Sequence, residues 1–389
     1  MSRAFLLSAP FVRVWTLSLA AGVAGFLLFP TAPLRLAELG APPAAAGSFL
    51  AALTFASAAA AAWTGALGDR LGRRRVLVAA AATLAVLGGL YSLPLPWPLF
   101  VALAVPHGVA WSALLTAASA EAARVVPAAR RAEGLAYHGL AMNVAIAVAP
   151  ALGFGLIAGG WRWLCVALVA VNLLAAVLAG RLGPDPPRSP ATDGGALGRA
   201  LVEWRVLGLS SALFACSFGY GGATSFVALL CRERGIRPES AFFTAFAIAV
   251  FALRPMTAPW VDRVGPRRAL PWCILALGAA LAWLPFSVTA VGIAGGGLLL
   301  GAGFSTLYPA FSTLVLSRVG AARRGAAFGA MLAAFDVGIG GGSLAFGPIV
   351  ERWGYRVAFV GSAALALAAL PLLARGARRW EQRPVPDGA

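Results

Sequence analysis

The chain joins two long apolar runs through the stretch Gly65-Ala66-Leu67-Gly68-Asp69-Arg70-Leu71-Gly72-Arg73-Arg74. A related stretch, Val261-Asp262-Arg263-Val264-Gly265-Pro266-Arg267-Arg268, repeats its Asp-Arg-x-Gly core 193 residues later (262 − 69). The same displacement separates Ala128-Ala129-Arg130-Arg131 from Ala321-Ala322-Arg323-Arg324. Matches in register at charged connectors indicate that the chain consists of two halves built on one plan.

The composition indicates that both halves lie in a membrane. Of the 389 residues, 60% are hydrophobic and 12% are charged, and the mean hydropathy is +0.83. Soluble domains are about 45–50% apolar and about 25% charged, which disfavours a soluble enzyme, a nucleic-acid-binding protein and a disordered chain. The net charge of +17 comes from 31 basic residues, all of them Arg, and 14 acidic residues. In such a chain the arginines report membrane topology rather than a nucleic-acid partner.

Twelve apolar stretches are long enough for membrane-spanning helices, since a span needs about 20 mostly apolar residues. Irregular backbone in lipid leaves amides unpaired, so we expect these stretches to be helices. The predicted fold class is an all-α polytopic membrane protein with 12 transmembrane helices. The predicted spans are 11–33, 47–64, 76–93, 98–123, 133–158, 161–180, 206–230, 239–260, 269–287, 289–317, 326–349 and 355–375.

The arginines are unevenly distributed over the connectors. Twenty-three of the 31 lie at the N-terminus, in alternate connectors and in the C-terminal tail. Because positively charged loops stay inside, this predicts a multi-pass protein of the inner (cytoplasmic) membrane with both termini in the cytoplasm. The connector 181–205 contains several Pro and Gly residues, as linkers do. The predicted domains are a six-helix bundle over 1–180, the cytoplasmic linker 181–205, and a second six-helix bundle over 206–389 with a short cytoplasmic tail.

The first motif also carries a family resemblance. Residues 65–74 follow the pattern Gly-x-Leu-x-Asp-Arg-x-Gly-Arg-Arg, which resembles the loop 2–3 signature of the major facilitator superfamily (MFS). The resemblance covers essentially the whole chain and implies the MFS fold, two pseudo-symmetric six-helix bundles that rock around a midplane cavity. Segments 106–111, 130–135 and 335–340 are similar to a bacterial branch of arabinose-efflux or drug-efflux permeases.

This resemblance implies a secondary active transporter that works by alternating access, with proton-coupled efflux of a small amphipathic molecule or metabolite as the leading function. This chain departs from proton-driven relatives in three features. Ala104 stands where many of them have an Arg in the fourth span, and residues 149–154 match the antiporter motif only in part. The first span also lacks the carboxylate that many of them have. A sugar or organic-acid importer or facilitator without proton antiport is therefore the alternative. A non-transporting receptor or assembly subunit is the third hypothesis.

The charged motif predicts a conformational latch on the cytoplasmic side. Gly65 and Gly72 permit close packing and a tight turn, and Asp69 can accept hydrogen bonds from a helix N-terminus. The arginines can pair with a carboxylate at the end of another helix, for which Glu121 is the candidate; alternatively they only anchor the topology at lipid headgroups. The predicted latch residues are Gly65, Asp69, Arg70, Gly72, Arg73, Arg74, Glu121, Asp262 and Arg263.

Polar and aromatic residues inside predicted spans are candidates for the transport site, because charge in hydrocarbon is costly. Asp336 lies about ten residues into the eleventh span, near the midplane. We expect Asp336 and His107 to couple transport to protons; the alternative for both is a hydrogen-bonded residue in the helix packing. The predicted cavity residues are Trp111, Asn143, Arg254 and Phe335, and Arg254 has the alternative of reaching the interface beside Asp262.

The sequence lacks motifs for ATP hydrolysis, catalysis and metal binding. No GxxxxGK[ST] stretch and no nucleophile–base set is present, so we expect neither ATP hydrolysis nor enzymatic activity. Cys165, Cys216, Cys231 and Cys273 lack metal-ligand spacing, and we expect no metal site and no cofactor. The expected partners are a small-molecule substrate, protons and the lipid bilayer, without nucleic acid, and we expect a monomer.

Overall fold

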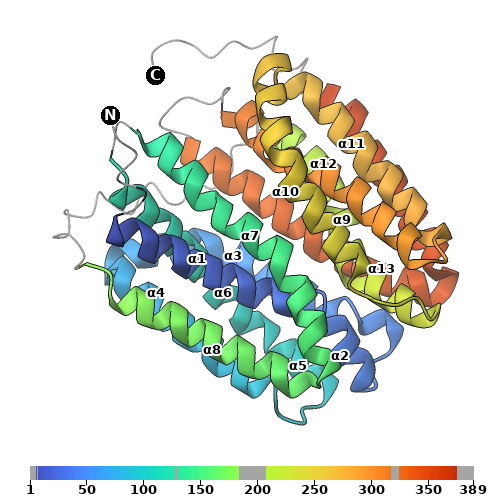
Figure 1. Ribbon diagram of the computed structural model, residues 1–389, viewed down its shortest axis with the longest axis horizontal. Coiled ribbons are helices and arrows are strands. Elements are labelled where there is room, and N and C mark those ends of the chain that lie inside the picture. The colour runs from blue at the N-terminus through green and yellow to red at the C-terminus, as the bar shows by residue number, and fades with distance from the viewer. Residues whose placement is uncertain (1–5, 7, 128–129, 184–206, 317–323, 375–389) are drawn as a thin grey trace. The chain divides into compact units, whose positions relative to one another are not determined.

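The computed structural model describes residues 6, 8–127, 130–183, 207–316 and 324–374, and these residues form helices and no strand. The first half forms α1 (Ala9–Leu28), α2 (Ala32–Glu38), η2 (Pro43–Ala45), α3 (Ser48–Leu71), α4 (Arg73–Leu90), α5 (Trp97–Ala102), α6 (Ala104–Val125), α7 (Arg131–Ala158) and α8 (Trp161–Gly180). The second half forms α9 (Leu207–Glu233), α10 (Ala241–Val264), α11 (Pro266–Trp283), η4 (Leu284–Phe286), α12 (Ala290–Leu316) and α13 (Arg324–Leu367) (Figure 1).

Nine stretches of the described chain are long and apolar enough to cross a membrane. The last of them, Ala330–Ala374, contains Gly354, whose φ of 79° and ψ of 169° divide α13 into two helices. Helix α4 falls outside the nine and begins with three arginines; the apolar part of α10, Ala241–Arg254, is shorter. The helical membrane fold is confirmed, and the count of twelve spans remains a prediction.

The two copies of the Asp-Arg-x-Gly motif form the same backbone turn. Gly72 precedes α4 with φ 94° and ψ 136°, and Gly265 precedes α11 with φ 81° and ψ 150°. A residue with a side chain is strained at positive φ, whereas glycine is not. Gly160 and Gly354, 194 residues apart, form a second such pair, with φ values of 115° and 79°. The sequence repeat is therefore also a repeat of helix-start geometry.

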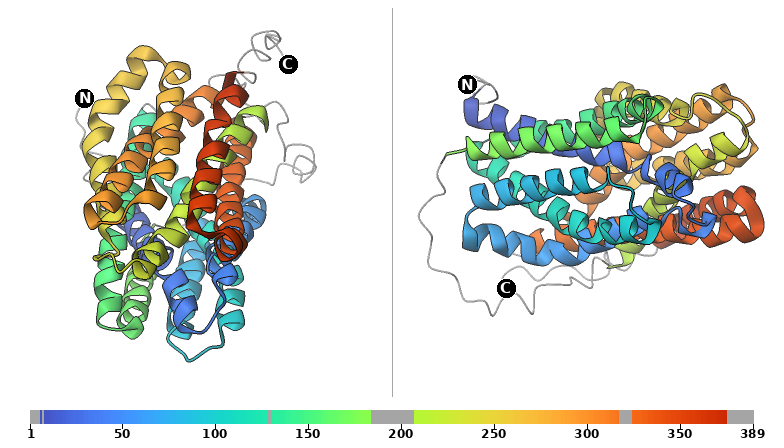
Figure 2. Two further views of the ribbon diagram at one scale, coloured as in Figure 1. Left: turned by 90° about the vertical axis from the view of Figure 1, so that its right-hand side faces the viewer. Right: turned by 90° about the horizontal axis from the view of Figure 1, so that it is seen from below.

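By packing, the chain divides into two compact units, each described here separately. The first unit comprises Met1–Ala41 and Phe55–Ala191. In it α1 packs along α7 and α8, and α4 packs along α8 and α6 (Figure 2). Its core consists of leucines and many alanines, and Leu17, Leu77 and Leu114 are fully buried. Small side chains let the helix backbones approach closely, which is how helices pack in lipid.

The second unit comprises Pro42–Thr54 and Thr192–Ala389. Here α9 packs along α13, while α12 packs against both α10 and α11. The short helix η2 packs against α13, where an added Cβ at Gly347 would overlap the carbonyl oxygen of Ala44. The predicted linker 181–205 falls mostly on 184–206, outside the described residues, so the predicted domain boundaries remain predictions.

Glycines on both helices make the α9–α13 contact unusually close, and we call this contact the glycine seam. An added Cβ at Gly221 of α9 would overlap the carbonyl oxygen of Ile339. An added Cβ at Gly342 of α13 would likewise overlap the carbonyl oxygen of Phe218. With no side chains between them, the two backbones are in direct contact. The seam therefore determines which residues of α13 lie beside α9.

Candidate functional site

Five aromatic side chains from four helices of the second unit form one connected group, here called the aromatic cluster: Tyr220 (α9), Phe246 (α10), Phe304 and Tyr308 (α12), and Phe335 (α13). Tyr220 stacks on Phe304 with ring centroids 4.4 Å apart. Phe246 contacts both of these rings, at 5.8 Å from Tyr220 and 5.6 Å from Phe304. Phe335 lies 6.0 Å from Phe304 and 5.3 Å from Tyr308.

The aromatic cluster has a buried side and an accessible side. Tyr220 and Phe246 are buried, at 8% and 3% exposure. Phe304, Tyr308 and Phe335 are partly exposed. The buried rings hold the accessible ones in place, since aromatic pairs at these distances add about 0.5–1.5 kcal/mol beyond the burial of their surface. The accessible rings are thus a preformed apolar wall.

Asp336 is the neighbour of this wall on α13. It follows Phe335 directly and its side chain is partly exposed. It is also well inside its helix, because α13 begins at Arg324. The sequence predicted Asp336 for proton coupling and Phe335 for the cavity. In the structure the Phe335 ring contacts that of Tyr308, and Asp336 is the next residue on α13.

Sequence reasoning missed four of the five aromatic residues, but the internal repeat contained the signal for one. Trp111 of α6 lies 193 residues before Phe304 (304 − 111), the displacement of the charged motifs. In the first unit the Trp111 ring lies over Gly25, where an added Cβ would come within 2.7 Å of ring atom Cζ3. Phe29, the residue directly after α1, contacts Trp111 with ring centroids 5.5 Å apart in an edge-to-face arrangement. Each unit therefore places an aromatic side chain at the matching position.

His107 lies in a different part of the molecule from Asp336, in the first unit. It is 3% exposed, and its Nδ1 is 3.3 Å from the hydroxyl of Tyr91. Trp161 in turn donates its indole N–H to the carbonyl oxygen of Tyr91 at 2.8 Å. His107 thus has a hydrogen-bonding partner between α6 and the end of α4, as the packing alternative requires. Its predicted part in proton coupling remains a prediction.

The other predicted cavity residues lie on α7 and α10. Asn143 is partly buried on α7, which packs along α1. On the same helix, His138 Nε2 lies 3.5 Å from the hydroxyl of Ser18, a pair that the sequence did not predict. Arg254 is partly exposed on α10, and its carbonyl oxygen accepts a hydrogen bond from Thr257 at 3.4 Å. Arg254 is eight residues from Phe246, or about 12 Å along the helix.

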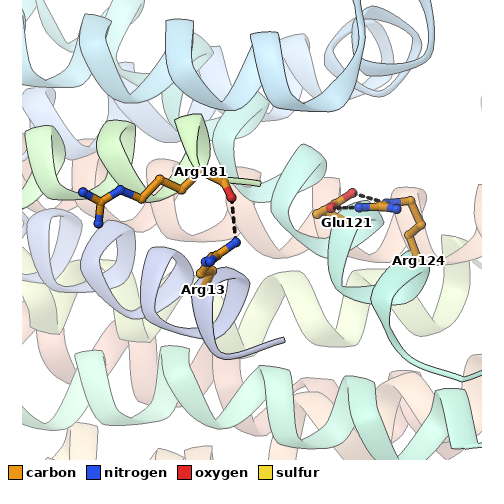
Figure 3. Close-up of polar contacts among 4 residues, drawn as sticks. All are labelled: Arg13, Glu121, Arg124 and Arg181. Carbon is orange, nitrogen blue, oxygen red and sulfur yellow. Dashed lines mark hydrogen bonds and ion pairs between the residues drawn. The ribbon is translucent and has the colours of Figure 1, made fainter. Parts of the chain in front are cut away.

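The predicted latch residues are only partly described. Arg124 of α6 holds the buried carboxylate of Glu121, with its Nε 2.7 Å from one oxygen and its Nη2 on the other (Figure 3). Arg70, Arg74 and Arg263 are exposed. The side chains of Asp69 and Asp262 lie outside the described residues, and so does the burial of Gly65. The predicted pairing of Glu121 with the loop arginines therefore stays a prediction.

Figure 3 also shows a contact in the first unit between α1 and the end of α8. Arg13 of α1 donates from Nη1 to the carbonyl oxygen of Arg181, 2.8 Å away, just after α8. A cation at the C-terminus of a helix is favourable because the last carbonyls have no partner within the helix. This contact ties α1 to α8 independently of the 65–74 motif.

In the described part of the chain, no three His, Cys, Asp or Glu side chains come together in a way that would hold a metal ion. The four cysteines have free, buried thiols.

The sequence profile of the Major Facilitator Superfamily matches residues 14–242 and 235–388. The chain belongs to the major facilitator superfamily. This MFS protein is 27% identical over 352 residues to an uncharacterized MFS-type transporter of Salmonella typhimurium, covering 87% of this chain and 88% of that protein. It is 30% identical over 215 residues to an uncharacterized MFS-type transporter of Pseudomonas aeruginosa, spanning about half of each chain (54% and 52%).

Solved structures share the fold of this MFS protein. A POT family transporter in complex with 5-aminolevulinic acid superposes with a TM-score of 0.78 at 10% identity, over 95% of this chain and 96% of that one. The nucleoside transporter NupG superposes with 0.74 at 14% identity, and the human organic anion transporter MFSD10 with 0.68 at 16%, each over 94% of this chain and 99% of that one. At these identities the likeness concerns the fold alone. Its membership of the superfamily and its relatives named as transporters make it a multi-pass membrane transporter.

Proposed function

We propose that this MFS protein is a secondary active transporter of the bacterial inner membrane that exports a small amphipathic molecule in exchange for protons. Asp336 is the group that carries the proton. The observation that supports this is the partly exposed carboxyl group of Asp336, inside an apolar span and directly after Phe335, whose ring belongs to the aromatic cluster. A carboxyl group in such surroundings is costly when charged, which makes it a candidate for a functional role.

The aromatic wall supports an amphipathic substrate. Phe304, Tyr308 and Phe335 offer apolar ring surface, and Asp336 and the Tyr308 hydroxyl offer polar atoms at its edge. Small-molecule sites combine a mostly apolar lining with a few polar groups in this way. Alternating access then requires that the proton and the substrate leave Asp336 and the wall on opposite sides of the membrane.

The test is proton flux in proteoliposomes that contain a pH-sensitive dye, under an imposed pH gradient. Three probes of similar size are added in turn: the permanent cation phenethyltrimethylammonium, its uncharged carbon isostere and the permanent anion phenylpropanesulfonate. We expect at least one of them to evoke proton flux beyond that of protein-free vesicles. Asp336→Asn abolishes this flux but still binds the uncharged isostere, because removing the titratable group leaves the rings in place.

A matched control is Glu351→Gln, which removes an exposed carboxylate from the same α13. We expect its flux to remain within about twofold of wild type, because an exposed charge contributes little to a buried site. Proton flux in Asp336→Asn that equals wild type would rule out Asp336 as the carrier. If none of the three probes evokes proton flux in the wild-type protein, proton exchange itself is contradicted, and the uncoupled importer or facilitator becomes the preferred function.

A further inference from the structure

The aromatic cluster and Asp336 also indicate what kind of substrate the site takes. We propose that this site binds lipophilic organic cations, molecules in which a positively charged nitrogen is attached to an aromatic or alkyl body. This inference rests on the proposed function and names its substrate class. It is carried by three features of the second unit: the ring geometry, the position of the carboxyl group and the way that the glycine seam holds both.

The accessible rings present π faces and edges in different directions. Tyr308 meets Phe335 edge to face, with an interplanar angle of 67°, and Phe304 is tilted from Phe335 by 42°. One face of Phe304 is covered by the nearly parallel Tyr220, at 23°. A cation is attracted to the face of an aromatic ring within about 6 Å of the centroid. Rings inclined to one another surround a compact cationic group better than a flat stack.

The positive charge expected of the ligand follows from the carboxyl group of Asp336. The other acidic residues of the described chain lie at or near helix ends or in connectors, whereas Asp336 lies twelve residues after the start of α13. In a medium of low dielectric constant a carboxylate attracts a cation strongly and repels an anion equally. Asp336 is the residue next to Phe335 on the same helix, so a ligand on the Phe335 ring is near a carboxyl group.

The glycine seam makes the arrangement rigid. Gly338, two residues after Asp336, packs so closely on α9 that an added Cβ would lie 2.7 Å from the carbonyl oxygen of Phe214. On α9, Gly221 follows Tyr220 directly and packs in the same way on α13. The seam thus fixes Phe335 and Asp336 relative to Tyr220, which stacks behind Phe304. A preformed wall of this kind binds with less loss of side-chain entropy than a flexible one.

The test is equilibrium binding to the full-length protein in detergent, which needs no transport and no pH gradient. We expect phenethyltrimethylammonium to bind at least about tenfold more tightly than its uncharged isostere, and phenylpropanesulfonate to bind most weakly. Equal affinity for the cation and the isostere, or preference for the anion, overturns the proposal. So does a wild-type protein that does not bind the cation.

Two substitutions separate the ring from the charge. Phe335→Leu keeps the apolar volume and loses the π face, so we expect it to weaken cation binding about tenfold while the isostere changes by less than about threefold. Asp336→Asn is expected to weaken binding of the cation about tenfold or more and to leave the affinity for the isostere unchanged. Phe335→Trp keeps a π face at this position, and we expect it to bind the cation as the wild-type protein does. A loss in Phe335→Leu is then due to the missing π face and not to a change of residue at this position as such. Equal losses for both probes in Phe335→Leu overturn the proposal.

The matched control is Phe251→Leu, which changes an exposed Phe on α10 outside the aromatic cluster. It is expected to leave the affinity of all probes unchanged. Failure of this inference is distinct from failure of the proposed function. If the anion or the isostere binds and evokes proton flux, export with proton exchange stands and the cation class is wrong; if the cation binds and no probe evokes flux, the site stands and the coupling is wrong.

Discussion

Gly342 of α13 lies directly against the backbone of Phe218 in α9, where an added Cβ would overlap the Phe218 carbonyl oxygen. The next residue toward the N-terminus, Gly341, has no atom nearer than 3.7 Å to such a Cβ. Neighbouring glycines on one helix thus have opposite surroundings. Because the seam determines where Asp336 and Phe335 lie relative to Tyr220, the small residue at 342 is a requirement of the candidate site.

We expect Gly342→Ala to lower the melting temperature of the purified protein and to weaken binding of phenethyltrimethylammonium several-fold. The added methyl group must push α9 and α13 apart, and overpacking of this kind costs about 1–3 kcal/mol. Gly341→Ala is the control and should change neither quantity, since its Cβ enters ordinary van der Waals space. Equal melting temperatures for the two variants would show that the seam has room to adjust.

The positive φ of Gly72 motivates a second pair of variants, in the charged motif. Its φ of 94° strains any residue with a Cβ. We expect Gly72→Ala to destabilise the protein by about 1–3 kcal/mol, measured as a lower melting temperature or a smaller folded fraction after extraction into detergent. Gly68→Ala, four residues earlier in α3, should be tolerated, because its Cβ would meet only Arg73 Cγ at 3.8 Å. Destabilisation by Gly68→Ala alone would contradict this assignment.

Tyr91→Phe tests the environment of His107. The substitution removes the hydroxyl 3.3 Å from His107 Nδ1 and keeps the ring that packs on Phe100 at 4.9 Å. We expect a loss of about 1 kcal/mol in stability, the usual value for a buried hydrogen bond, together with unchanged proton flux. Thermal unfolding and the proteoliposome assay measure the two effects. A loss of flux at unchanged stability would instead support His107 as a member of the proton pathway.

The predicted latch is tested by Asp69→Asn. If Asp69 takes part in pairs that form and break during the transport cycle, this substitution should slow turnover about tenfold while probe affinity stays within about twofold. Arg75→Gln, which removes an exposed charge adjacent to the motif, is the control and should leave turnover near wild type. A large loss of affinity at normal turnover would argue against a latch.

Much of the fold was predictable from the sequence because its signals are local or periodic. Apolar runs of the length of a span can only be helices in lipid, and the described parts of the predicted spans are mostly helical, with turns at 29–31 and at Leu103. Gly72 of the first Asp-Arg-x-Gly motif predicted a tight turn, and it has positive φ. Asp336 and Phe335 were also found from the sequence, since polar and aromatic residues inside a span stand out by type.

The membrane class, the repeat of two halves and the family can thus be inferred from the chain alone, because composition, spacing and one charged motif carry that information along it. That Tyr220, Phe246, Phe304 and Tyr308 join Phe335, and that Tyr91 lies beside His107, is seen only in the folded protein. These contacts depend on how the faces of separate helices meet. In a chain with 22 Phe, no local pattern distinguishes a ring in the wall from one that faces lipid, and the closeness of α9 to α13 appears only when the glycines of both helices are brought together.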